Sequence, residues 1–307
     1  MNNVITQEDI ALVKSKGFLI DKRTGTHFNA RVITVNGKIT AEKLEIIAKA
    51  SKLFGSGEVA FTTRLTCEVQ GIPFENINPF ISYLEENGLK TGGTGPKVRP
   101  VVACKGTTCQ YGNIDTYGLA KKIHELFYEG YRGVILPHKF KIAVGGCPNN
   151  CVKPNLNDVG VIGQKVPVIN YEKCRGCKVC ALEKACPLSV PTVVDGKVYI
   201  DSKLCNNCGR CVKKCPFKAV EDYMVEYKLY VGGTFGKKFN IATPISLTFS
   251  TEEEVLSAIE KCILIFKHYG VKGERFAKTI ERVTLNEVER LLSCNELLDK
   301  KLEILEK

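Results

Sequence analysis

The 307-residue chain has 44% hydrophobic and 25% charged residues and a formal net charge of +11. This composition is that of a folded globular protein and excludes a disordered chain. No apolar run approaches the roughly 20 residues that cross a bilayer, so we expect no membrane-spanning segment. The first residues lack the basic and then apolar pattern of a signal peptide, and we expect a cytoplasmic location.

The first 89 residues predict a compact α+β unit. Thr40 can cap a helix over residues 41–54, where apolar positions recur at helical spacing. Apolar and polar residues then alternate from about Glu58 to Gln70, which predicts a long strand with Arg64 on its polar face. That face is turned either to solvent or to a bound group. A second helix is predicted over residues 76–87.

Two cysteine pairs follow this unit. A strand predicted over residues 98–103 leads to Cys104 and Cys109, and the second pair stands in the sequence Cys147-Pro148-Asn149-Asn150-Cys151. Four cysteines in two close pairs can hold one metal ion or one iron–sulfur cluster. Disulfides are disfavoured, because the cytosol keeps thiols reduced.

Positive charge stands directly beside the second cysteine pair. A strand predicted over residues 139–144 runs into that pair, and its lysines, Lys139 and Lys141, alternate with apolar residues. Both lysines therefore share one face of the strand. A cluster beside a cationic surface indicates electron-fed chemistry on a small anion.

Residues 166–220 carry a different cysteine pattern. A Cys-x2-Cys-x2-Cys run followed by Cys-Pro occurs twice, about 30 residues apart, as is typical of a ferredoxin with two [4Fe–4S] clusters. In such a ferredoxin the fourth cysteine of each run binds the other cluster. The predicted ligands are Cys174, Cys177, Cys180 and Cys215 for the first cluster, and Cys186, Cys205, Cys208 and Cys211 for the second. Zinc is the alternative, but its ligands do not follow this swapped repeat.

The last part of the chain predicts a strand over residues 225–231 and helices that begin after Thr251 and Thr284, each with a capping box. No dinucleotide fingerprint occurs in the sequence. Cys67 and Cys262 fall on apolar faces and are predicted to be buried thiols, and Cys294 has no assigned role.

The cysteine assignments change how the net charge is interpreted. A four-cysteine [4Fe–4S] unit carries a charge of about −2, so three of them offset about half of the basic excess. The remainder suits anionic cofactors and an anionic substrate. We therefore expect no nucleic-acid partner.

Several motifs together resemble those of the sirohaem-dependent sulfite and nitrite reductases. Phe61-Thr62-Thr63-Arg64-Leu65-Thr66 resembles the Thr-x-Arg strand of that family, and Leu136-Pro137-His138-Lys139-Phe140-Lys141 resembles its Leu-Pro-x-Lys-Phe-Lys strand. Cys147-Pro148-Asn149-Asn150-Cys151 matches its cluster loop, and Gly273-Glu274-Arg275-Phe276 resembles a C-terminal motif. The likeness is strongest to the compact form with an inserted ferredoxin domain, such as the catalytic chains of anaerobic sulfite reductases and small dissimilatory-like proteins.

The resemblance implies an α+β, sulfite-reductase haemoprotein-like fold in three parts. Residues 1–89 would form a ferredoxin-like half domain. Residues 90–165 and 221–307 would form the sirohaem and [4Fe–4S] domain. Residues 166–220 would form an inserted bacterial-type ferredoxin domain with two [4Fe–4S] clusters.

The resemblance also implies specific roles for the cysteines and cations. Cys104, Cys109, Cys147 and Cys151 would bind a [4Fe–4S] cluster coupled to sirohaem, with Cys151 as the bridging ligand and Asn149 beside the cofactor. Arg64, Arg99, Lys139 and Lys141 would line the substrate pocket. Arg31 faces either solvent or a cofactor carboxylate. The family commonly spaces its first cysteine pair by five residues, whereas Cys104 and Cys109 enclose four.

The implied activity is six-electron reduction of sulfite to sulfide, with three [4Fe–4S] clusters and sirohaem as cofactors. Electrons would come from an external ferredoxin or a partner reductase subunit. Nitrite reduction to ammonia on the same centre is one alternative, and a non-catalytic electron-transfer polyferredoxin is another. One cysteine set per chain implies one active site, either alone or within a homo-oligomer.

Overall fold

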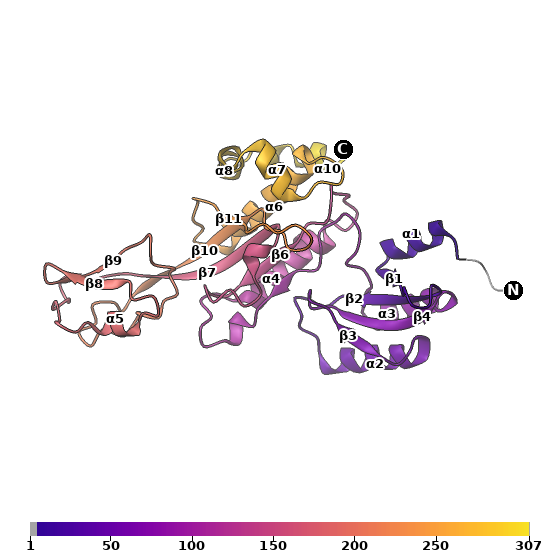
Figure 1. Cartoon of the computed structure of the whole chain (residues 1–307), viewed down its shortest axis with the longest axis horizontal. Helices are drawn as coiled ribbons and strands as arrows, with labels where there is room; N and C mark the ends of the chain where they lie inside the picture. The colour runs from indigo at the N-terminus through magenta and orange to yellow at the C-terminus, as the bar shows by residue number, and fades with distance from the viewer. Residues whose placement is uncertain (1–4, 307) are drawn as a thin grey trace.

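A computed structural model of the chain describes residues 5–306. The first four residues, which belong to the stretch without a signal-peptide pattern, lie outside it. Figure 1 shows an N-terminal unit on the right, a central unit beneath a layer of C-terminal helices, and a slender extension on the left. Within residues 5–306, no helix is both long and apolar enough to cross a membrane.

The N-terminal unit is a four-stranded antiparallel sheet with order β1-β2-β4-β3. The helices α2 and α3 pack against each other and enclose a core with Phe18, Phe28, Phe80 and Ile47. The predicted helix over residues 41–54 is confirmed, with Thr40 as its cap. The elements are α1 (Gln7–Ser15), β1 (Phe18–Ile20), β2 (His27–Val32), α2 (Ala41–Phe54), β3 (Val59–Phe61), β4 (Cys67–Pro73), the 3-10 turn η1 (Phe74–Asn76) and α3 (Ile77–Glu86).

The predicted single strand from Glu58 to Gln70 is wrong, because the chain reverses between β3 and β4. The N–H of Thr62 donates to the carbonyl of Thr66 over 2.9 Å, and Leu65 adopts a φ of 60°. The Thr62 hydroxyl also accepts from the N–H of Arg64 at 3.3 Å. Short hydroxyl side chains stabilise turns in this way and override the alternating pattern. Arg64 therefore lies at a hairpin tip.

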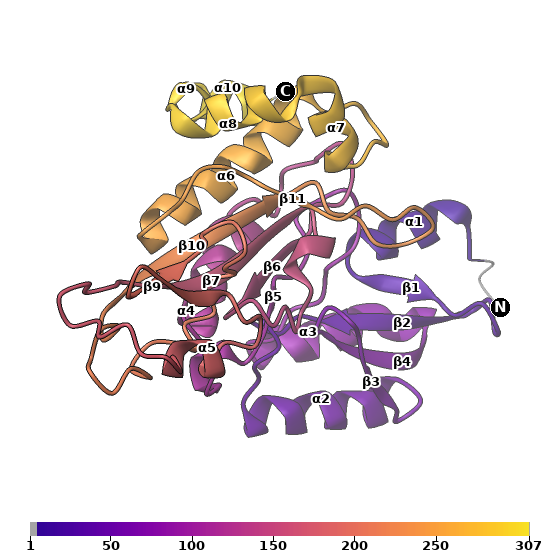
Figure 2. The ribbon, with the colours of Figure 1, turned by 60° about the vertical axis from the view of Figure 1, so that its left-hand side comes forward.

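The central unit is a mixed five-stranded sheet with order β11-β10-β7-β6-β5. The strands β5, β6 and β7 run parallel, and β10 pairs antiparallel with β7. Figure 2 shows α6 along one side of this sheet, beneath the later helices. The strands are β5 (Val102–Ala103), β6 (Ile142–Gly145), β7 (Val159–Pro167), β10 (Tyr223–Val231) and β11 (Thr243–Pro244).

The helices of the central unit bury a large core that includes Phe140, Phe266 and Phe276. The predicted starts of α6 and α8 are confirmed, with a complete capping box at α6 and, at α8, a Thr284 side chain that accepts from the N–H of Glu287. Cys262 is fully buried as expected. The elements are η2 (Gly106–Thr108), α4 (Thr116–Ile123) with its π-helical continuation η3 (His124–Glu129), η4 (Pro154–Leu156), α6 (Glu252–Tyr269), α7 (Phe276–Val283), α8 (Leu285–Ser293), α9 (Glu296–Asp299) and α10 (Lys301–Glu306).

The strand predicted over residues 139–144 begins later than expected, at Ile142. The N–H of Lys141 donates to the carboxylate of Asp158 at 2.8 Å instead of to a neighbouring strand. Lys139 and Lys141 consequently stand on the segment that enters β6, where the N–H groups of both lysines donate to side chains.

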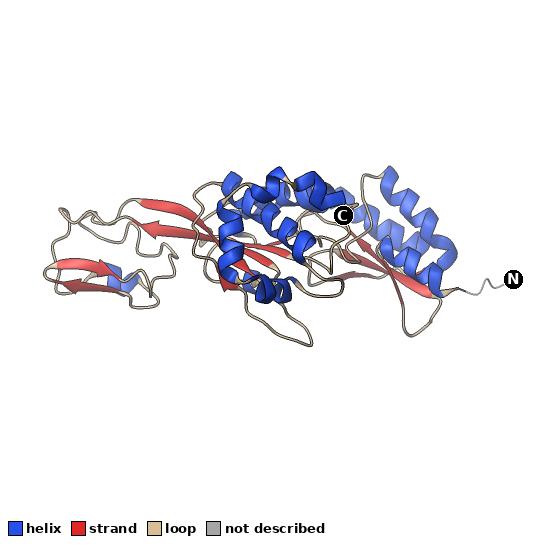
Figure 3. Ribbon diagram, turned by 90° about the horizontal axis from the view of Figure 1, so that it is seen from above, coloured by secondary structure: helices blue, strands red, loops and turns tan. Residues whose placement is uncertain are grey.

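Residues 166–220, here called the insert, extend from the far ends of β7 and β10 (Figure 3). They contain α5 (Ala181–Ala185) and the hairpin of β8 (Pro191–Val194) and β9 (Lys197–Ile200). The buried residues of this part are Cys174, Leu182, Val198, Cys211, Ala219 and Val220. So small a core cannot stabilise a segment of this length by apolar burial alone, which favours stabilisation by bound clusters.

Candidate functional site

The two cysteine pairs of the central unit meet where β5 and β6 end. The Sγ of Cys104 accepts a hydrogen bond from the N–H of Gly146 at 3.1 Å. A Cβ added to Gly106 would stand 2.9 Å from the Cα of Gly146 and 2.6 Å from the Thr116 side chain. Glycine is therefore required here, because the two cysteine loops pack backbone against backbone.

The four thiols of these loops lie close enough to influence one another. Burial raises the pKa of Cys147, and the thiols of Cys104, Cys151 and Cys109 raise it further, while the N–H of Asn149 opposes the rise. Within residues 5–306, no group of three or more His, Cys, Asp or Glu side chains is arranged to hold a single metal ion.

The loop around Cys151 is open on one side. Cys151 is exposed, as is Asn149. The Oδ1 of Asn150 is buried without a hydrogen-bond partner among the described residues. This loop can therefore present a thiolate outward, toward a further group.

All five cations predicted for the site line one cavity of about 330 Å³, here called the basic cavity. Arg31 comes from β2, Arg64 from the hairpin tip, and Arg99 from the segment before β5. Lys139 and Lys141 complete the set. Among the described residues that line it there is no carboxylate, so the basic cavity suits an anion.

Arg64 joins the N-terminal and central units. Its guanidinium donates to the carbonyl of Pro100 at 2.6 and 3.1 Å, to that of Ile142 at 3.1 Å, and to Oδ1 of Asn157 at 3.0 Å. Burial lowers the pKa of Arg64 to about 10, and the cations around it contribute to that shift. It remains charged at neutral pH, held mainly by neutral acceptors.

Arg99 and Arg31 are less completely paired. Both guanidinium groups donate to the carbonyl of Gly93, and Arg31 also contacts Glu68 at 3.4 Å. Burial, followed by the charge of Arg31, lowers the pKa of Arg99 to about 10. Its Nε is buried with no acceptor among the described residues. A buried donor without a partner is costly, so this side chain is suited to an anionic ligand.

The pKa values of Lys139 and Lys141 are both lowered. Burial and the neighbouring Arg64 lower the pKa of Lys141 to about 8. Burial, Arg275 and Arg99 lower the pKa of Lys139 as well. A lysine whose pKa lies near neutrality can donate a proton and then be protonated again by solvent.

Asp158 partly offsets this positive charge and was not identified from the sequence. It is fully buried, accepts from Arg275 at 2.8 Å through both oxygens, and accepts from the N–H of Lys141. Burial raises the pKa of Asp158, and the charge of Arg275 opposes that rise. Asn157 was missed too. The available signal was the polar pair Asn157-Asp158 directly before the apolar run of β7.

A second cavity, of about 780 Å³, adjoins the basic cavity at Lys139. It is lined by Phe235, Phe239, Lys237, Lys238 and Arg275, among others. The Nε of Arg275 is buried without a partner in the described part of the chain. Glu274 and Glu281 line it as well, and Arg275 is paired with Asp158. Aromatic side chains beside several cations fit a flat group that carries carboxylates, as a polycarboxylate tetrapyrrole does.

The insert brings together one predicted cysteine quartet clearly. Burial, together with the thiols of Cys205, Cys208 and Cys186, raises the pKa of Cys211 to about 11, so these four thiols are neighbours. In the other predicted quartet, Cys174 is buried and Cys180 and Cys215 pack against the same small core, with Cys177 half-buried. Cluster binding by either quartet stays a prediction.

This architecture, with its cysteine loops and basic cavity, defines the class of the protein. Residues 94–302 match the family described as nitrite and sulphite reductase 4Fe-4S domain. Residues 20–87 match the nitrite/sulfite reductase ferredoxin-like half domain. The chain therefore belongs to the nitrite and sulfite reductase family, and the membership predicted from the sequence is confirmed.

Two curated proteins show how similar this chain is to individual members of the family. The chain is 33% identical over 281 residues to a coenzyme F420-dependent sulfite reductase of Methanocaldococcus jannaschii, a match that covers 89% of this chain and 44% of the relative. It is 30% identical over 165 residues to one of the subunits of the anaerobic sulfite reductase of Salmonella typhimurium, a match that covers 49% of this chain and 47% of that one. The chain thus spans less than half the length of these curated relatives.

A solved structure supports the fold. The crystal structure of a dissimilatory sulfite reductase I superimposes with a TM-score of 0.69 at 22% identity, covering 87% of this chain and 69% of that one. The predicted combination of a ferredoxin-like half domain with a 4Fe-4S domain is therefore confirmed.

Proposed function

We propose that this protein reduces sulfite to sulfide on a sirohaem centre coupled to a [4Fe–4S] cluster. The observation that carries the proposal is the basic cavity, where five predicted cations meet and no carboxylate is among the described lining residues. The family membership and the identity to a coenzyme F420-dependent sulfite reductase over most of this chain support it. Six electrons and six protons convert hydrogen sulfite to hydrosulfide and three water molecules.

The cofactors would be held by groups already described. Cys104, Cys109, Cys147 and Cys151 would bind the coupled cluster, and the exposed Cys151 suits the bridging position. Arg275 and Arg31 would pair with carboxylates of sirohaem. When bound, this centre would supply electrons to the anion.

The cations of the basic cavity would then have separate roles. Arg64 and Arg99 stay charged and would neutralise sulfite oxygens, while their fixed positions stabilise the charge that develops as S–O bonds break. Lys141 would transfer protons to the departing oxygens, because its pKa of about 8 lies closest to neutrality. Lys139, at the boundary of the two cavities, would help to hold the anion.

The electron path would run through the insert. The N–H of Lys165 on β7 donates to the carbonyl of Asn207 at 2.8 Å, which fixes the Cys205–Cys211 loop against the central sheet. The cluster of Cys186, Cys205, Cys208 and Cys211 would therefore be the neighbour of the coupled cluster. The one of Cys174, Cys177, Cys180 and Cys215 would lie further out.

The division into three parts belongs to the same proposal. Residues 1–89, residues 90–165 with 221–307, and residues 166–220 would each form a unit, and the separate hydrophobic cores within them support this division. Electrons would come from an external ferredoxin or partner reductase subunit.

Nitrite is the second candidate substrate, because the family includes nitrite reductases and the same cations suit either anion. Steady-state rates with reduced methyl viologen and each anion separate the two. We expect the larger kcat/KM with sulfite, and a much larger value with nitrite would overturn the assignment.

The visible spectrum and iron content of the anaerobically purified protein test the cofactors. Chlorin-type absorption bands with about 13 iron atoms per chain are expected from three clusters and one sirohaem. About eight iron atoms without those bands would indicate a polyferredoxin that reduces neither anion.

A further inference from the structure

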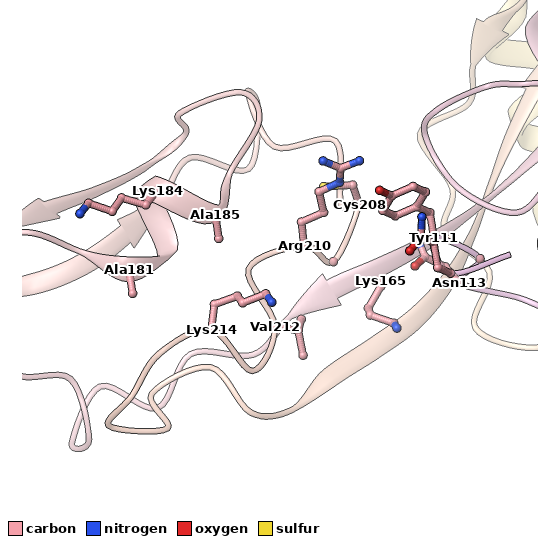
Figure 4. Close-up of a pocket in the computed structure, with 13 residues that line it drawn as sticks. Tyr111, Asn113, Lys165, Ala181, Lys184, Ala185, Cys208, Arg210, Val212 and Lys214 are labelled. Carbon is pink, nitrogen blue, oxygen red and sulfur yellow. The ribbon is translucent and has the colours of Figure 1, made fainter.

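A third cavity lies outside the catalytic site, between the insert and the loop that follows Cys109. It measures about 710 Å³ and is here called the interdomain cleft (Figure 4). Tyr111 and Asn113 form one wall, and α5 and the loop from Cys208 to Lys214 form the other. Lys165 of β7 lies at its floor, where the insert joins the central sheet.

The interdomain cleft is cationic throughout. Lys165, Lys184, Arg210 and Lys214 line it, and no Asp or Glu is among its described lining residues. None of these four forms a salt bridge to any carboxylate in the part of the chain that the structure describes, although fifteen other salt bridges form there. The charges of these four cations are therefore not neutralised within the chain, and they are available to bind a negatively charged partner.

Aromatic rings hold two of these cations without neutralising them. Arg210 stacks 4.6 Å from the ring centre of Tyr111, and Lys165 stands 4.5 Å from that of Tyr223. A cation–π contact fixes a position but leaves the full positive charge. The contact of Arg210 with Tyr111 also spans the cleft, from the insert to the central unit.

The interdomain cleft adjoins two predicted clusters. Cys208, a predicted ligand of the insert, lies in its wall. Tyr111 follows the predicted ligand Cys109 by two residues, and Arg210 stands between Cys208 and Cys211. Any redox protein seated here would stand against the cluster nearest to the catalytic centre.

We propose that the interdomain cleft is the docking site of an acidic electron-donor protein, such as a ferredoxin with a carboxylate-rich surface around its own cluster. This inference rests on the proposed function, which requires an external donor. At each encounter one electron would pass from the reduced donor to the cluster that Cys186, Cys205, Cys208 and Cys211 would hold, so the donor is oxidised and that cluster reduced by one electron. No bond breaks and no proton needs to move.

The arrangement favours a protein surface over a small anion. Lys184 and Lys214 are exposed, whereas Lys165 and Arg210 are half-buried. Figure 4 shows the charged ends of Lys184, Lys165 and Arg210 pointing in different directions. A phosphate-sized ligand needs donors that converge on one point, but carboxylates spread over a protein surface can meet separated cations.

The test is a double charge reversal, Lys184→Glu with Lys214→Glu, in the full-length holoprotein. The probe is a purified acidic two-cluster ferredoxin, reduced photochemically, at low ionic strength. We expect the KM for this ferredoxin to rise about tenfold or more, while turnover with reduced methyl viologen is unchanged. Added salt should weaken the wild-type interaction and reduce the difference between the two proteins.

The matched control is Lys173→Glu with Lys203→Glu, which makes the same change of charge equally close to cluster cysteines but outside the cleft. An equal loss in this control, or no change in the cleft variant, would overturn the proposal. Stoichiometric binding of pyrophosphate that only the cleft variant loses, with ferredoxin kinetics unaffected, would also overturn it and indicate a small-anion site. Absence of viologen-driven turnover in the wild type would contradict the proposed function instead, and ferredoxin binding would still be measurable by titration.

Discussion

The Nη1 of Arg64 donates to the Oδ1 of Asn157 over 3.0 Å, although the two residues are 93 positions apart. The Nδ2 of Asn157 donates in turn to the carbonyl of Lys153, whose N–H donates to the carbonyl of Asn150. The N–H of Asn150 donates to the carbonyl of Cys147. A continuous series of hydrogen bonds thus connects the basic cavity to the cysteine loop.

Replacement of Asn157 by leucine should lower kcat for sulfite by about tenfold or more, because Arg64 loses the acceptor that fixes its guanidinium. Asn157→Asp keeps an acceptor and should retain more activity. Both variants should keep the iron content and visible spectrum of the wild type. Equal activity of Asn157→Leu and the wild type would show that the other acceptors position Arg64 sufficiently.

The pH dependence of turnover should report Lys141. Its pKa is lowered to about 8, so it can donate a proton below that pH and loses this capacity as pH rises through it. The kcat profile with reduced methyl viologen should therefore fall on the alkaline side, near the pKa of about 8. In Lys141→Arg the rate should drop and this alkaline decline should disappear, since a guanidinium stays charged. An unchanged decline in that variant would identify another group as the donor.

Asp158→Asn should destabilise the protein by about 3 kcal/mol, because it leaves Arg275 beside the other cations without its buried counter-charge. Glu68→Gln is the matched comparison. It removes a looser pair with Arg31, at 3.4 Å between partly exposed side chains, and should cost less than about 1 kcal/mol. Urea unfolding midpoints of the two holoproteins give the measurement. Equal midpoints would contradict the special role of Asp158.

Gly106→Ala should prevent assembly of the coupled cluster. The new Cβ would stand 2.6 Å from the Thr116 side chain and 2.9 Å from the Cα of Gly146, which would push the two cysteine loops apart. About four iron atoms per chain should be lost while the insert clusters remain. Gly133→Ala is the control, since a Cβ there meets nothing within 4 Å. Full iron content in both variants would show that the loops can adjust.

Cys211→Ser should unfold the insert, while the hydrophobic cores of the N-terminal and central units stay folded. The insert has a core of few buried residues, so its order depends on the ligands. Amide hydrogen exchange should accelerate over residues 166–220 and stay slow in α2 and α6. Uniform protection in the variant would mean that the insert folds without its second cluster.

The sequence by itself determined the family and most helices, and it predicted the three cysteine quartets. These features depend on local spacing: glycines, capping boxes such as Thr251-x-x-Glu254, and the repeated Cys-Pro pattern act over a few residues. The motifs also identified the five cations, but not what each contacts.

Only the tertiary structure decided how those residues are used. Local alternation predicted one strand from Glu58 to Gln70, yet threonine hydroxyls turn the chain there and place Arg64 at a hairpin tip. Asn157, Asp158 and Arg275 acquire their importance from partners distant in sequence, which no local pattern encodes. The same holds for the interdomain cleft, because its cations come from segments that meet only when β7 and β10 carry the insert to the side of the central sheet.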